Sequence, residues 1–250
     1  MPSLISPDQI AAEWDQLSPA QRLISLRRSV AGRLVFTTSF GAEDQALTHI
    51  IAEAGLDIEL ATLDTGRLFP ETYDVWAATE LRYGLRIRGY YPEQSALASY
   101  VTENGINGFR DAIQARKDCC AIRKVEPLRR ALLGAVGWIT GLRADQSDAR
   151  QSVPWLAHDD GFSLLKANPL RDWSRDQVSE FLQAHNVPQN ALHAQGFVSI
   201  GCAPCTRAIE PGESERAGRW WWEASSKECG LHVGPDGRLV RAQKQTEQVA

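Results

Sequence analysis

The sequence predicts an α/β fold, a parallel twisted sheet with helices on both faces. Short apolar runs of strand length alternate with amphipathic runs of helix length. The helical runs carry capping residues at their ends, and polar loops follow the apolar runs. Such alternation indicates βαβ units, whose parallel strands lie between two layers of helices. The 250 residues, 43% of them hydrophobic, suffice for one full-sized domain, or for one domain with an appendage.

The expected strands and helices follow one another along the chain. Strands are expected over residues 33–39, 57–65, 84–92 and 136–142. Helices are expected over residues 6–17, 18–30, 43–55, 71–84, 124–134 and 172–188. Gly55 ends the third helix, and Ser174 with Gln177 forms a capping box at the start of the last one. We therefore expect residues 1–205 to form one α/β domain. Residues 206–250 are polar and weakly patterned, and we expect a flexible C-terminal segment there.

Three polar loops follow the first, second and fourth expected strands, at residues 38–44, 63–71 and 140–150. In open parallel sheets, ligands bind outside the carboxyl ends of the strands. The position of these loops therefore predicts one shared pocket.

The charge pattern favours a small anionic ligand. Lysine and arginine number 27 against 31 aspartates and glutamates, so the net charge is −4, which gives no reason to expect a nucleic-acid surface. Basic residues nevertheless cluster locally, as in Arg123, Lys124, Arg129 and Arg130. The N-terminus has no signal-peptide pattern, and no apolar run approaches 18 residues. We expect a cytoplasmic protein with no membrane segment.

The five cysteines divide into four and one. Cys119 and Cys120 are adjacent, Cys202 and Cys205 form a C-x-x-C pair, and Cys229 stands alone. Four thiolates suit an iron–sulfur cluster or a zinc ion, and a site without metal stays open as well. Adjacent ligands favour a [4Fe–4S] cluster, because neighbouring side chains diverge and can reach different corners of a cube.

The residues around two of the cysteines favour a charged reactive site. Lys124 lies one helical turn beyond Cys120 and is expected on the same helix face. Cys229 has Lys227 and His232 nearby, and cations raise the thiolate fraction of a thiol. Cys229 is therefore a candidate nucleophile, with an inert thiol in the C-terminal segment as the alternative.

Several motifs together resemble the assimilatory sulfonucleotide reductases: LDTGRLFPET, KDCCAIRKVEPL, TGLRADQS, IGCAPCTR and KECGLH. The resemblance is to the branch that carries a [4Fe–4S] cluster, the adenylyl-sulfate (APS) reductases, and it covers roughly residues 30 to 235. It implies an adenine-nucleotide α-hydrolase-like (PP-loop) fold, which agrees with the βαβ pattern.

The resemblance also implies a reaction. Cys229 would attack the sulfur of adenosine 5′-phosphosulfate, expel AMP and keep a thiosulfonate, from which a thiol of reduced thioredoxin would release sulfite. We expect thioredoxin to be a separate protein, and a homo-oligomer is compatible with the sequence.

The resemblance implies roles for eighteen residues. The metal ligands would be Cys119, Cys120, Cys202 and Cys205. The catalytic residues would be Cys229, Lys124 and His232. The substrate-binding residues would be Thr38, Ser39, Gly41, Glu43, Asp64, Thr65, Gly141, Arg143, Arg150, Arg216 and Arg219. The first loop reads Ser39-Phe40-Gly41-Ala42-Glu43-Asp44, which departs from the S-G-G-x-D-S form of ATP-cleaving relatives.

Three other functions are weighed against this one. A reductase of 3′-phosphoadenylyl sulfate (PAPS) typically lacks the four cluster cysteines, although some cluster-containing members accept both nucleotides. A PP-loop tRNA sulfurtransferase would show the S-G-G-x-D-S loop and a more basic surface. A metal-binding module without enzymatic activity would not explain the Cys229 motif or the strand-end loops.

Overall fold

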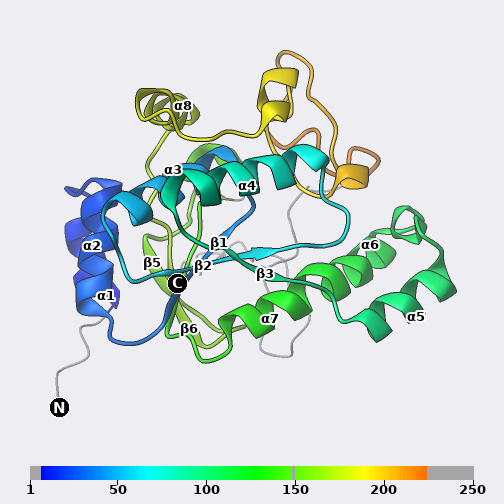
Figure 1. Cartoon of the computed structure of the whole chain (residues 1–250), viewed down its shortest axis with the longest axis horizontal. Coiled ribbons are helices and arrows are strands. Elements are labelled where there is room, and N and C mark those ends of the chain that lie inside the picture. The colour runs from blue at the N-terminus through cyan, green and yellow to red at the C-terminus, as the bar shows by residue number, and fades with distance from the viewer. Residues whose placement is uncertain (1–6, 148–149, 224–250) are drawn as a thin grey trace, which may run out of the picture.

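A computed structural model of the chain describes residues 7–147 and 150–223, which contain a six-stranded sheet (Figure 1). The strands are β1 (Leu34–Thr38), β2 (Glu59–Leu63), β3 (Arg88–Tyr90), β4 (Gly137–Ile139), β5 (Leu156–Asp159) and β6 (Leu164–Ala167). Their order across the sheet is β3-β2-β1-β4-β6-β5. All neighbours pair in parallel except β5, which runs antiparallel to β6 at one edge.

The helices connect these strands and cover the sheet. They are α1 (Pro7–Trp14), α2 (Pro19–Ser29), α3 (Ala42–Glu53), α4 (Pro70–Tyr83), α5 (Gln94–Asn104), α6 (Ile113–Cys120), α7 (Glu126–Leu132) and α8 (Arg175–Ala184). Figure 1 shows α3, α4 and α8 on one side of the sheet and α7 on the other. The predicted fold class, a largely parallel sheet between two helical layers, is confirmed.

The side chains of β1 show how the sheet is buried on both faces. Leu34 and Phe36 belong to a core shared with α2, α3 and α8, whereas Val35 packs in a second core with α7. Successive strand residues point to opposite faces, so a strand that is apolar at every position is buried from both sides. This burial is the physical reason for the continuous apolar run in the sequence.

The predicted helix ends are confirmed where a local signal exists. Gln177 N donates to Ser174 Oγ over 3.1 Å, and Ser174 N donates to Gln177 Oε1 over 2.7 Å, which completes the capping box of α8. Gly55 follows the end of α3 with φ of 57°, a left-handed conformation that glycine adopts without a steric penalty.

Two parts of the fold differ from the sequence-based expectation. The hairpin of β5 and β6 was not expected, so the sheet is not wholly parallel. These strands have four residues each and include His158, Asp159 and Lys166. They are too short and too polar to show a clear alternation of apolar and polar residues in the sequence. Helices α5 and α6 were not expected either. Tyr100 is the one buried residue of α5, so that helix has no apolar stripe to reveal it.

The chain stays packed beyond the boundary that we expected at residue 206. Thr206 bridges Arg219 in antiparallel fashion, and Trp220 N donates to Cys205 O over 3.2 Å. Trp220 is 1% exposed. Packing therefore continues to Glu223, and the rest of the expected C-terminal segment, residues 224–250, lies outside the described residues. Of the helices in residues 7–147 and 150–223, none is both long and apolar enough to cross a membrane.

Arg22 of α2 is expected to stabilise the fold. Its guanidinium is 2% exposed, donates twice to Asp172 and once to Pro169 O, and lies 3.9 Å from the ring centroid of Trp155. A lysine cannot reproduce this fork, so Arg22→Lys should lower the free energy of unfolding by about 2 kcal/mol.

Thermal unfolding measures this effect, and the exposed Arg28 of the same helix provides the control. The midpoint should fall by several degrees in Arg22→Lys and stay within about one degree of the wild type in Arg28→Lys. Equal midpoints for the two variants would contradict this role of Arg22.

Candidate active site

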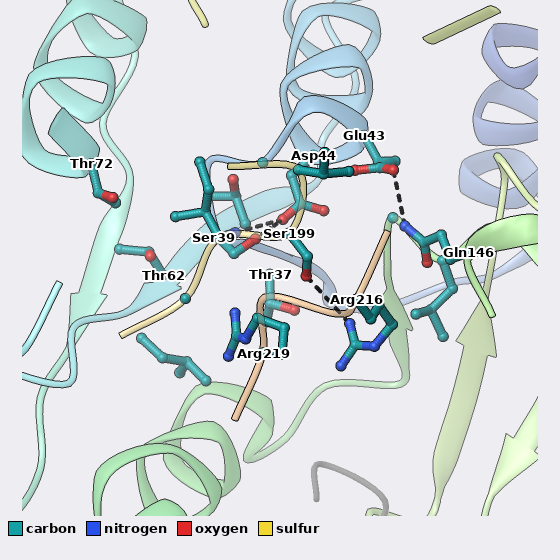
Figure 2. A pocket seen from close by; sticks show the side chains of 18 of the residues that line it. Thr37, Ser39, Glu43, Asp44, Thr62, Thr72, Gln146, Ser199, Arg216 and Arg219 are labelled. Carbon is teal, nitrogen blue, oxygen red and sulfur yellow. Dashed lines mark hydrogen bonds between the residues drawn. The ribbon is translucent and has the colours of Figure 1, made fainter. Parts of the chain in front are cut away.

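A cavity of about 260 Å³ lies at the carboxyl ends of the parallel strands (Figure 2). It occupies the place where open α/β sheets bind ligands, and we call it the nucleotide cavity after the ligand that the sequence resemblance implies. The loops after β1, β2 and β4 line it, together with residues 198–201 and with Glu215, Arg216 and Arg219. Ten residues that the sequence had singled out line this cavity: Thr38, Ser39, Gly41, Glu43, Thr65, Lys124, Gly141, Arg150, Arg216 and Arg219.

The loop between β1 and α3 is held by the carboxylate of Asp44. Asp44 Oδ2 accepts hydrogen bonds from Ser39 N over 2.6 Å and from Ser39 Oγ over 2.7 Å. A Cβ atom at Gly141 would lie 2.4 Å from Asp44 Oδ1, so this close approach requires glycine. Burial raises the pKa of Asp44 to about 6, against the lowering effect of these hydrogen bonds.

Phe40 is the bulky residue by which this loop departs from the S-G-G-x-D-S form, and its side chain points away from the nucleotide cavity. It is 1% exposed, belongs to the core on the α3 side, and stacks on Trp76 with ring centroids 5.5 Å apart. Its φ is 60°, unusual for a bulky residue. The Phe40 side chain therefore anchors the loop from below while Ser39 and Gly41 face the cavity.

The first turn of α3 also faces the cavity. Gly41 is its N-cap, and Glu43 and Asp44 lie in the first turn, where acidic side chains are favoured by the helix dipole. In Figure 2, Glu43 and Asp44 lie in the upper part of the group of labelled side chains, and Arg216 and Arg219 lie below them. The cavity thus has an acidic and a basic side.

The structure places two predicted substrate residues outside the cavity lining. Asp64 is buried beside the cavity, where its Oδ1 accepts hydrogen bonds from Gly66 N over 2.8 Å and Tyr73 Oη over 2.9 Å. Arg143 is buried among carboxylates. Both residues shape the loops around the cavity, so the structure gives no support to their direct contact with substrate.

Sequence reasoning missed part of the lining. The missed residues are Thr37, Asp44, Thr62, Leu63, Leu68, Thr72, Leu142, Gln146, Val198, Ser199, Ile200, Gly201 and Glu215. Some signal existed for residues 198–201, which directly precede Cys202, and for Glu215, which directly precedes Arg216. No local pattern marks Thr62 or Thr72, because their side chains meet the others only through the sheet topology.

The four paired cysteines line a second, smaller cavity, which we call the cysteine cavity. Its other lining residues are Phe109, Arg116, Arg123, Lys124, Arg219 and Trp220. The Thr65 hydroxyl lies 3.3 Å from Cys202 Sγ. Within the described residues, no three His, Cys, Asp or Glu side chains are grouped to hold a single metal ion.

Lys124 and Arg219 line both cavities. Arg219 lies so close to Gly201 that a Cβ atom there would be 2.0 Å from its Nη1. Burial raises the pKa of Cys205 to about 11, while Lys124 and Arg219 oppose this shift. The two cationic side chains therefore form a wall common to the cysteines and to any ligand in the nucleotide cavity.

A widened turn of helix positions Lys124. The helix of Cys119 and Cys120 continues as a π-helical turn over Ala121–Val125 and then as α7. Such turns insert one extra residue and are frequent at functional sites. Arg123 of this turn donates to Thr65 O over 2.6 Å, which ties the turn to the loop after β2.

The two remaining predicted catalytic residues, Cys229 and His232, lie outside the described residues.

Comparison with known proteins agrees with this geometry. Residues 33–208 match the phosphoadenosine phosphosulfate reductase domain. The chain belongs to this family. It is 52% identical over 211 residues to the adenosine 5′-phosphosulfate reductase of Sinorhizobium fredii, with 84% of each chain covered. It is 54% identical over 200 residues to that of Allochromatium vinosum, with 80% of this chain and 78% of the other covered.

Solved structures show the same fold. The phosphoadenylyl-sulfate (PAPS) reductase of Candida auris superposes with a TM-score of 0.68 at 25% identity, covering 81% of this chain and 98% of the other. The FMN adenylyltransferase of Candida glabrata shares the fold alone, with a TM-score of 0.50 at 16% identity over 94% of this chain and 86% of its own. The predicted family and PP-loop fold class are thereby confirmed.

The raised pKa of Asp44 predicts a titration near pH 6. The folded protein should hold the Asp44 proton below about pH 6 and lose it above, whereas an unfolded chain loses it near 3.8. Infrared difference spectra between pH 5 and 7 should show the band of a protonated carboxyl disappearing, and Asp44→Asn should lack that change. An identical spectral change in Asp44→Asn would contradict the assignment.

Proposed function

We propose that this chain reduces adenosine 5′-phosphosulfate to sulfite and AMP, with reduced thioredoxin, a separate protein, as the electron donor. One observation carries the proposal: Lys124 and Arg219 line both the nucleotide cavity and the cysteine cavity. An anion held at that wall would lie next to the paired cysteines. Relatives at 52% and 54% identity carry the name of this activity.

We propose a [4Fe–4S] cluster as the resident cofactor, held by Cys119, Cys120, Cys202 and Cys205. A single zinc ion needs four sulfurs about 4 Å apart, whereas a cubane accepts more widely spaced thiolates, one on each iron. All four cysteines line one small cavity, which supports a single cofactor shared by them. When bound, the cluster would supply a compact charged centre beside Lys124 and Arg219.

Three buried N–H groups also fit such a cofactor. Within the described part of the chain, Arg123 Nε, Arg219 Nε and Trp220 Nε1 have no hydrogen-bond partner, and all three residues line the cysteine cavity. A buried donor without an acceptor costs free energy. Thiolate and sulfide sulfur atoms are acceptors that could satisfy these donors, so the donor set suits the group.

The proposed chemistry begins at Cys229. Its thiolate attacks the sulfur of the phosphosulfate, a sulfur–sulfur bond forms, and the sulfur–oxygen bond to AMP breaks. A thioredoxin thiolate then attacks Cys229 Sγ and releases sulfite, and the second thioredoxin thiol resolves the mixed disulfide. The two electrons come from the thioredoxin dithiol, so the oxidation state of the cluster stays unchanged. Thiol chemistry of this kind assigns the enzyme to a reducing compartment, the cytoplasm.

The cations of the nucleotide cavity explain how this step would be accelerated. Negative charge shifts onto the phosphate oxygens of the departing AMP while a thiolate approaches an anionic sulfonate. Lys124, Arg216 and Arg219 line the cavity in which these charges would lie. Cations placed in advance stabilise such a transition state more than they would in water. His232, beside the nucleophile in the sequence, completes the set proposed as catalytic.

The acidic side of the cavity favours the nucleotide without a 3′-phosphate. Glu43, Asp44 and Glu215 line the cavity together with the cations. Carboxylates suit ribose hydroxyl groups as acceptors and repel a further phosphate. PAPS reduction is the alternative, favoured by the likeness to the Candida auris enzyme.

Sulfite formation from the two nucleotides tests the proposed function. With reduced thioredoxin, kcat/KM for adenosine 5′-phosphosulfate should exceed that for the 3′-phosphorylated nucleotide by about 100-fold or more, since one unfavourable charge contact costs roughly 3 kcal/mol. A preference for the 3′-phosphorylated nucleotide would select the alternative. No sulfite from either nucleotide would overturn the proposal.

Replacement of the nucleophile separates chemistry from cofactor assembly. Cys229→Ser should release no sulfite while retaining about four iron and four sulfide per chain, because four other cysteines hold the cluster. Its affinity for AMP should match that of the wild type. Full turnover by this variant would refute the thiosulfonate step, and bound zinc in place of iron and sulfide would refute the cofactor.

A further inference from the structure

We propose that Arg143 is a positioning residue, which holds the acidic side chains of the nucleotide cavity and, through them, the arginines that bind substrate. The inference rests on the proposed function, because those arginines are assigned to the sulfonucleotide there. Sequence resemblance suggested direct contact between Arg143 and substrate. The structure instead buries the Arg143 side chain, 1% exposed, behind the residues that line the cavity.

The guanidinium of Arg143 joins three segments that are distant in the sequence. Nε donates to Glu43 Oε1 over 2.8 Å, and Nη2 donates to Glu215 Oε2 over 2.9 Å. Nη1 donates to Asp145 in the adjoining 3₁₀ turn. Each guanidinium nitrogen therefore donates to a different carboxylate. Loss of this one side chain would leave two partly buried carboxylates, Glu43 and Glu215, and the exposed Asp145 without their shared cation.

One branch of this network leads to Arg150. Gln146 Nε2 donates to Glu43 Oε1 over 2.9 Å, a contact drawn in Figure 2. Gln146 Oε1 accepts from Arg143 N over 3.2 Å and from Arg150 Nη1. The backbone of Arg143 and the side chain of Arg150 thus donate to the same amide oxygen, while the amide nitrogen donates to Glu43, which the Arg143 guanidinium also contacts. Displacement of Gln146 would therefore displace Arg150 at the edge of the nucleotide cavity.

The other branch leads to Arg216. Glu215 directly precedes Arg216 in the chain, and its carboxylate accepts a hydrogen bond from Arg143. Arg216 Nη1 lies 3.5 Å from Ser199 Oγ on the cavity wall (Figure 2). Burial raises the pKa of Glu215, and the Arg143 charge opposes that rise. The Arg143 charge therefore favours the ionised form of Glu215, and the hydrogen bond fixes this carboxylate next to the backbone that presents Arg216.

The geometry explains why an arginine is needed at this position. Burial of a guanidinium is costly unless each donor finds an acceptor, and here acceptors come from three directions. A lysine would keep the positive charge. Its single nitrogen cannot donate to Glu43 and Glu215 at once along the two directions that the guanidinium nitrogens provide. Arg143→Lys therefore tests the hydrogen-bond geometry alone, because it preserves the charge and removes the planar set of guanidinium donors.

The test measures sulfite formation by the cluster-loaded Arg143→Lys variant at increasing nucleotide concentration. The expected result is a KM for adenosine 5′-phosphosulfate raised about tenfold with a smaller change in kcat, since binding contacts of ground and transition state are lost together. The matched control is Arg86→Lys, whose side chain is 87% exposed and paired with Glu80 at the surface. The control should keep the wild-type KM.

A double variant separates positioning from a general loss of structure. If Arg143 acts through Arg216, Arg216→Lys should raise KM by a smaller factor in the Arg143→Lys background than in the wild type. Factors that simply multiply would overturn the positioning role. An unchanged KM in Arg143→Lys would overturn it as well.

Calorimetric titration with AMP tests the positioning role of Arg143 without any turnover, so failure of this inference can be told apart from failure of the proposed function. Arg143→Lys should bind AMP about tenfold more weakly than the wild type, whatever reaction the enzyme performs. Weakened AMP binding with no sulfite formation by the wild type would refute the function and support the inference.

If Arg143→Lys fails to fold, Glu215→Gln takes its place with the same expectations. Wild-type KM and wild-type AMP affinity in that variant would overturn the inference.

Discussion

The site depends on one constraint: two cationic side chains, Lys124 and Arg219, must stand between the cysteine cavity and the nucleotide cavity. They come from segments almost a hundred residues apart, so several features of the fold serve to bring them together. A π-helical turn follows the adjacent cysteines, and the bridge from Thr206 to Arg219 folds the later segment back. Gly201 leaves room for the guanidinium, because any Cβ atom there would collide with it. The sheet supplies the frame, since its carboxyl edge gathers the loops that complete the nucleotide cavity.

The balance of charge within the nucleotide cavity follows from the same arrangement. Of the residues that the structure describes, four cationic ones line it, and Glu43, Asp44 and Glu215 line it as well. Without the carboxylates, clustered cations would repel one another and attract any polyanion. The carboxylates offset part of this charge, and their oxygens can accept hydrogen bonds from hydroxyl groups. Buried Arg143 stands behind this acidic side and fixes two of its members. Selectivity among anions is then a property of the whole network, and the family's shared fold leaves room for different nucleotides.

Much of the fold could be predicted because its signals are local. The apolar run of β1, the capping box of Ser174 and Gln177, and the motifs around the cysteines each lie within a few residues. The β5–β6 hairpin escaped notice because its strands are short and polar, and α5 because it buries little. The role of Arg143 could not be predicted, since its partners Glu43 and Glu215 lie 100 and 72 residues away and only the folded chain brings them together. Asp44 illustrates the same limit, because its importance comes from burial against Gly141.

Because Lys124 and Arg219 line both cavities, an anion bound in the nucleotide cavity should change the electrostatic potential in the cysteine cavity. The most direct measurement is the resonance Raman spectrum of the Cys229→Ser protein loaded with the proposed cluster, a variant that lacks the proposed nucleophile and should not turn over. Saturation with adenosine 5′-phosphosulfate should shift the iron–sulfur stretching bands, because Lys124 and Arg219 then share their charge with the bound anion. The shift should be lost when Lys124→Ala is added to that variant, with nucleotide binding verified separately. Unchanged bands at saturation, with the nucleotide demonstrably bound, would contradict the account.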